Sequence, residues 1–161
     1  MRKGEKVIIG SMVCLGVMAM AFKAFQVPKI DSQDQRIPYF STASPELSDK
    51  AAFLIRQMKC RECHSLWATR DLTQNVPAPR LDGIGSLKTE EWLYGYISAE
   101  NPQEMLSSRL KVQYRMPSYA ALSDEDRRVL ASYLSSLKVE DWYLDETKRS
   151  EHEKLTGKPM E

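Results

Sequence analysis

An all-α domain is predicted for the centre of this 161-residue chain. Three segments combine helix-capping signals with apolar residues at helical spacing: residues 44–58, 89–98 and 122–137. No βαβ pattern is visible around them. The chain length and its 8 prolines allow one domain with appendages rather than two full domains. We therefore expect a small helical domain. An N-terminal transmembrane helix is expected before it and a C-terminal extension after it.

The first helix is predicted to begin after Ser44, a typical N-cap residue that Pro45 follows at the first helical position. Its apolar stripe at helical spacing consists of Leu47, Ala51, Leu54 and Met58. The stripe runs directly into Cys60. A helix packed against the core would therefore fix the position of residues 60–64, which follow it directly.

The other two helices have equally clear starts. Thr89 is the expected N-cap of the second helix, and Trp92 belongs to its apolar face. Ser123 and Asp126 resemble a capping box at the start of the last helix. The apolar face of that helix comprises Val129, Leu130, Tyr133, Leu134 and Leu137. We expect the last helix to cross the first and close the fold.

Cys60-Arg61-Glu62-Cys63-His64 has the spacing of a c-type haem attachment site. The thiols of Cys60 and Cys63 can add to the two haem vinyl groups, which places His64 where it can bind the iron. One covalent haem c is the predicted cofactor. Haem would also supply apolar bulk that a domain of this size lacks.

Two other uses of this motif fit less well. A structural zinc needs about four protein ligands, and the remaining Cys and His are Cys14, in an apolar run, and His152, in a charged tail. A thioredoxin-like redox pair is expected near βαβ patterning, which is missing here.

The surroundings of the iron can be predicted in part. The free N–H of His64 needs an acceptor, and a carbonyl near Pro79 is the candidate, since residues 75–85 are rich in Pro and Gly. Met116 is the favoured sixth ligand of the iron. Pro117 follows it and favours an extended backbone at Met116, which is typical of a loop. Met105, His152 and an open coordination position are the alternatives.

Trp92 has two possible roles. The simpler is a core position on the second helix. In the other, its indole N–H also donates to a haem propionate, since a buried indole needs an acceptor.

The N-terminal residues 1–27 read as a membrane anchor or a signal segment. Basic residues precede an apolar run over 7–22, and such flanks stay cytoplasmic while the following chain is exported. A retained anchor is favoured, with cleavage after Ala21 as the alternative. Residues 28–43 form the expected linker. The haem domain is then expected on the periplasmic side of the bacterial inner membrane.

Charge excludes one class of partner and suggests another. The net charge of +1 argues against nucleic-acid binding. Basic residues nevertheless cluster near the haem motif and before Met116: Arg56, Lys59, Arg61, Arg70, Arg109, Lys111 and Arg115. They form either a rim that steers an acidic redox partner or an ordinary soluble surface. The extension 139–161 is either a solvated helix that packs Trp142 and Tyr143 on the domain or a docking element.

Four features together resemble a class I monohaem cytochrome c with His/Met ligation. They are residues 60–64, the loop 78–83, the segment 114–117 and the helix 122–137. The resemblance covers residues 44–138 and implies His64 and Met116 as axial ligands and Pro79 as the carbonyl that holds His64. It also implies electron transfer rather than enzymatic catalysis.

One departure from that family lies in the first helix. Family members carry Gly and an aromatic residue where this chain has Ala52 and Arg56. Ala52 still permits close helix crossing. Phe53 is the expected substitute for the aromatic contact.

An anchored cytochrome of this kind resembles the cytochrome c subunit of bacterial bc-type quinol-oxidising complexes, whose partners carry haem b and iron-sulfur centres. The alternatives are the small subunit of nitric oxide reductase and a free periplasmic carrier. A haem enzyme or gas sensor with an open iron site is a further alternative.

Overall fold

The computed structural model describes residues 37–67, 69 and 76–160. The predicted anchor, residues 1–27, lies outside the described residues, as do Arg70 and residues 28–36 of the predicted linker. Within the described ranges, no helix is both long enough and apolar enough to span a bilayer.

The three predicted helices are present as α2 (Pro45–Gln57), α4 (Glu90–Ser98) and α6 (Asp124–Ser136). Each begins with the predicted cap, because a side-chain hydroxyl oxygen accepts a backbone N–H of the first turn. The accepting residues are Ser44, Thr89 and Ser123. Each bond satisfies one of the backbone N–H groups that have no partner within the first turn of a helix. The prediction of an all-α domain is confirmed.

Removing the cap of α6 tests how much this local signal contributes to stability. Ser123 Oγ accepts the Asp126 N–H at 3.1 Å and donates to the Asp126 carboxylate at 2.7 Å. Ser123→Ala is expected to lower the free energy of unfolding by about 1 kcal/mol, as measured by chemical denaturation. Ser123→Asn retains an acceptor and is expected to lose much less. Equal losses in the two variants would show that capping is not the cause.

Shorter elements connect these helices and extend the chain. They are the helices α3 (Ile84–Leu87) and α5 (Pro102–Met105), the 3₁₀ turns η2 (Cys60–Glu62), η3 (Val112–Tyr114) and η4 (Asp141–Tyr143), and the C-terminal helix α7 (Leu144–Thr156). Gly157 ends α7 in the left-handed conformation, with φ of 73°, as expected of a glycine after a helix.

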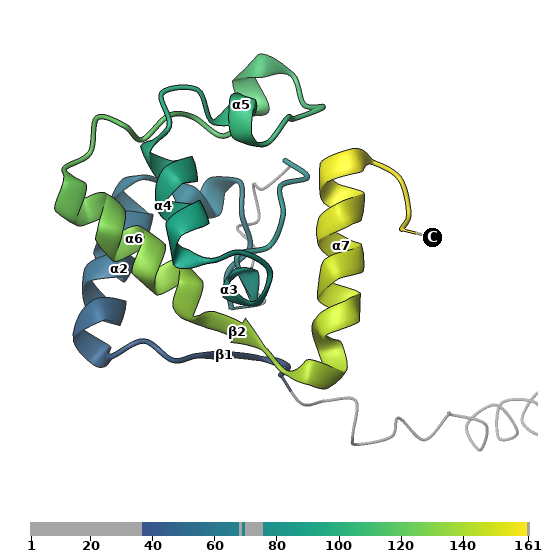
Figure 1. Cartoon of the computed structure of the whole chain (residues 1–161), viewed down its shortest axis with the longest axis horizontal. Coiled ribbons are helices and arrows are strands. Elements are labelled where there is room, and N and C mark those ends of the chain that lie inside the picture. The colour runs from purple at the N-terminus through teal and green to yellow at the C-terminus, as the bar shows by residue number, and fades with distance from the viewer. Residues whose placement is uncertain (1–36, 68, 70–75, 161) are drawn as a thin grey trace, which may run out of the picture. The chain divides into compact units, whose positions relative to one another are not determined.

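The core lies where α6 packs against both α2 and α4 (Figure 1). The predicted crossing of the first and last helices is therefore confirmed. The side chains that meet there are almost fully buried: Ala51, Leu54 and Ile55 from α2, Leu93 and Ile97 from α4, and Leu130, Ala131 and Tyr133 from α6. This packing holds the C-terminal end of α2, and with it the segment that follows, in a fixed position.

The prediction that Phe53 replaces the missing aromatic contact is wrong. Phe53 is 61% exposed, whereas Ile55, two residues later, is 4% exposed. On a helix, Ile55 shares a face with Ala51, which is completely buried. An aliphatic side chain therefore fills the core at this part of α2.

Two three-residue strands, which the sequence pattern does not reveal, join the ends of the domain. β1 (Tyr39–Ser41) pairs antiparallel with β2 (Leu137–Val139), with Phe40 opposite Lys138. β1 thus lies inside the segment expected to be a linker. The pairing ties the entry of the domain to the end of α6 (Figure 1).

The two aromatics after β2 behave differently. Tyr143 packs edge-on against Tyr39, with ring centroids 5.8 Å apart. Trp142 contacts the Tyr143 ring but is 52% exposed. Tyr143 thus packs back on the domain, as the solvated-helix interpretation expects.

Candidate functional site

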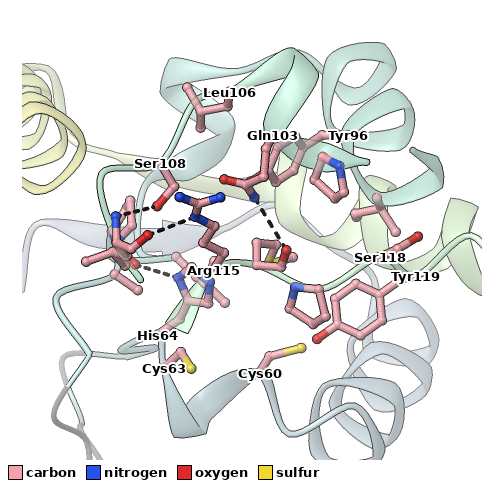
Figure 2. A pocket seen from close by; sticks show the side chains of 18 of the residues that line it. Cys60, Cys63, His64, Tyr96, Gln103, Leu106, Ser108, Arg115, Ser118 and Tyr119 are labelled. Carbon is pink, nitrogen blue, oxygen red and sulfur yellow. Dashed lines mark hydrogen bonds between the residues drawn. The ribbon is translucent and has the colours of Figure 1, made fainter. Parts of the chain in front are cut away.

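One cavity of about 740 Å³ collects the site residues named from the sequence. Its volume falls within the roughly 300–1,000 Å³ typical of cofactor sites. Cys60, Cys63 and His64 lie along one side of the cavity, and Gln103 and Leu106 lie along the other (Figure 2). Pro79, Trp92 and Met116 also line it.

The end of α2 sets the position of the two cysteines. Lys59 adopts the left-handed conformation, with φ of 56°, which ends the helix and turns the chain into η2. The His64 N–H then donates to the Cys60 carbonyl at 2.9 Å. Both thiols are partly buried, and burial raises the pKa of each above its ordinary value.

The imidazole of His64 is held in one orientation. Its Nδ1 lies 2.7 Å from the Pro79 carbonyl oxygen. Since a carbonyl can only accept, Nδ1–H is the donor and Nε2 keeps its lone pair. Burial lowers the pKa of His64, although the bond to Pro79 opposes this shift. The ring is therefore neutral near pH 7 and can bind a metal through Nε2.

Met116 reaches the same cavity from the long segment between α5 and α6. Its side chain is partly buried, and its backbone carbonyl accepts a hydrogen bond from the Gln103 side-chain amide at 3.5 Å. Two of the alternative ligands, Met105 and His152, do not line the cavity, and Met105 is 43% exposed. Met58 does line it, at the end of α2.

Trp92 contributes an aromatic surface to the cavity. Its ring stacks on Tyr96 at 5.0 Å, and the Lys88 ammonium lies 5.1 Å from its centroid. The geometry agrees with a role as an apolar packing residue. The bond from its indole N–H to a haem propionate stays a prediction.

A cytochrome c family model matches residues 48–138, which is more than half of the chain. The chain belongs to the cytochrome c family. It therefore carries a covalently attached c-type haem and functions in electron transfer through that haem. No curated protein and no solved structure matches the chain.

The cavity of this cytochrome fits a haem by the chemistry of its lining. It combines two thiols at the spacing that haem attachment needs, a neutral imidazole with a free Nε2, and a thioether. Apolar side chains such as Leu81, Leu93 and Ile97 complete the lining. Among the described residues, no group of three or more His, Cys, Asp or Glu side chains could hold a metal ion, so the zinc alternative lacks a ligand set there.

Tyr119 is a site residue of this cytochrome that the sequence pattern did not reveal. Tyr119 lines the cavity, and its hydroxyl donates to the Met58 carbonyl at 3.4 Å. Burial is the main cause that raises the pKa of Tyr119 to about 12, with the nearby Cys60 and Cys63 adding to it. Its position three residues after Met116, in a segment without helical period, was the only sequence signal available.

Proposed function

We propose that Cys60 and Cys63 hold the haem of this cytochrome, and that His64 and Met116 are the axial ligands of its iron. The observation that carries the proposal is the convergence of two thiols, an oriented imidazole and a thioether on one cavity. With both side chains bound to the iron, no coordination position would remain open for a substrate. An electron carrier is then favoured over a haem enzyme or gas sensor.

The residues of the chain prepare the site for one-electron exchange. The haem supplies the ferric–ferrous couple when bound. The Pro79 carbonyl fixes the His64 ring and increases its basicity as a ligand. The soft thioether of Met116 favours the reduced form and raises the potential. The Gln103 side-chain amide donates to the Met116 carbonyl and would help to position this ligand.

A basic surface near the cavity supports an acidic redox partner. Lys59 and Arg115 line the cavity and are exposed, and Arg61 is exposed beside them. Glu62 neutralises part of this charge, because it lies 3.4 Å from Lys59. Arg115 is held by a bond from its Nε to the Leu110 carbonyl at 2.8 Å. Fixed positive charge of this kind increases the rate of association with an acidic protein.

The complex in which this cytochrome works is proposed from the N-terminal sequence. An anchored cytochrome on the periplasmic side of the inner membrane would serve as a subunit of a bc-type quinol-oxidising complex. The apolar run over 7–22 with its basic flank supports the anchor. A small subunit of nitric oxide reductase and a free periplasmic carrier are the alternatives.

Gentle solubilisation of native membranes, followed by isolation of the full-length protein, tests this assignment. Co-purification of haem b with an iron-sulfur protein is the expected result. Haem b with non-haem iron would instead indicate nitric oxide reductase. Recovery of the protein alone in the soluble fraction would contradict the anchor and favour a diffusing carrier.

Replacing one attachment thiol tests the haem site. Cys63→Ser leaves one thioether at most, so covalent haem is expected to fall sharply when measured by haem staining of denaturing gels. Ser65→Ala, two residues further on, is the control, because Ser65 is buried but does not line the cavity. Normal haem attachment in Cys63→Ser would contradict the role of Cys63.

A further inference from the structure

The C-terminal helix α7 lies beyond the segment that matches the cytochrome c family, yet it reaches the haem cavity. Glu151 and Leu155 line that cavity together with Cys60 and His64. Their spacing of four residues places them on one face of α7. The same face includes Thr147, which is 7% exposed. Figure 1 shows α7 on the opposite side of α3 from α2.

One ion pair connects α7 to the body of the domain at the cavity. Glu151 Oε1 lies 3.6 Å from Lys88 Nζ, and their side chains are 16% and 25% exposed. The neighbouring pair on α7, between Lys148 and Asp145, is 47% and 85% exposed. Water therefore screens the Lys88–Glu151 pair much less than an ordinary surface pair.

The pair also belongs to the lining of the cavity. Lys88, Glu151 and Trp92 all line it, and the Lys88 ammonium lies 5.1 Å from the Trp92 ring centroid. Lys88 thus contacts both α7 and the aromatic surface of α4. Other charged residues line the cavity as well: Lys59, Glu62, Arg80, Glu100 and Arg115.

We infer that α7 is part of the haem site, with Leu155 forming part of its wall and the Lys88–Glu151 pair setting the local electric field. This inference rests on the proposed haem site. A paired Lys and Glu contribute little net charge, but removing one partner leaves the other charge uncompensated in a weakly screened position. The ferric haem carries one more positive charge than the ferrous haem. An uncompensated Lys88 would therefore raise the reduction potential, and an uncompensated Glu151 would lower it.

Reduction potentials of the haem-loaded, full-length variants test this inference. Glu151→Gln is expected to raise the midpoint potential and Lys88→Met to lower it, while the double variant returns close to wild type. Glu153→Gln is the matched control, because Glu153 is exposed on the same helix. Lys88→Gln replaces Lys88→Met if the latter yields no haem-loaded protein.

Two results would overturn the inference. Potentials of Glu151→Gln and Lys88→Met that match the Glu153→Gln control would show that α7 does not act on the haem. Shifts of both variants in the same direction would indicate a structural disturbance rather than a charge effect. Failure of the proposed haem site is distinguishable, because the wild-type protein itself would then lack covalent haem.

Discussion

Met116→Ala is expected to abolish the sulfur-to-iron charge-transfer band of the oxidised cytochrome and to make the reduced form bind carbon monoxide. The thioether of Met116 is the proposed ligand, and alanine leaves that coordination position open. The reduction potential is expected to fall by about a tenth of a volt or more, within the roughly 0.8 V that axial ligands span. Absorption spectroscopy and a redox titration measure these changes.

Met105→Ala is the matched control for this experiment. Met105 is the same residue type, lies at the end of α5, is 43% exposed and does not line the cavity. We expect its spectrum and potential to equal those of the wild type. A charge-transfer band that survives in Met116→Ala, or disappears in Met105→Ala, would contradict the assignment of Met116.

Gly85→Ala is expected to be among the most destabilising single substitutions in the domain. Gly85 lies in α3, where a Cβ atom would lie 2.8 Å from the Ser135 Cα of α6 and closer still to the Ser135 carbonyl. Backbone cannot move aside as the end of a side chain can. The loss in unfolding free energy should approach about 3 kcal/mol, the upper end of typical overpacking costs, as measured by urea denaturation of the haem-loaded protein.

Gly95→Ala separates this steric effect from the general effect of replacing a glycine. Gly95 lies inside α4, and its added Cβ would meet only the Met105 methyl at an ordinary 3.5 Å. Helix propensity then favours alanine, so we expect stability to rise by about 0.5–1 kcal/mol. If Gly85→Ala proved as stable as Gly95→Ala, the close approach of α3 and α6 would be contradicted.

The features that the sequence predicts well depend on neighbours in the chain. The caps at Ser44, Thr89 and Ser123 act over three residues, and the structure places all three as expected. The haem motif is equally local, because one turn after α2 fixes Cys60, Cys63 and His64 together. The bond from His64 to Pro79 spans 15 residues. It could still be predicted, because the sequence shows a Pro- and Gly-rich loop over residues 75–85.

The features that the sequence did not reveal depend on distant contacts. Strand β1 exists because β2, almost 100 residues later, pairs with it, and three residues are too few to show an alternating pattern. Ile55 is buried and Phe53 is exposed because of the way α6 packs on α2. The place of Glu151 beside Lys88 follows from the path of the chain through η4, which no local signal encodes.

A redox titration of the full-length cytochrome, followed by absorption under argon and again under carbon monoxide, tests the central claim most directly. Both axial positions are proposed to be occupied by side chains of the chain itself, so we expect one reversible one-electron transition with the same midpoint potential in both gases. A higher midpoint under carbon monoxide, with the spectrum of a carbon monoxide complex, would show an open iron site and contradict the assignment as a simple electron carrier.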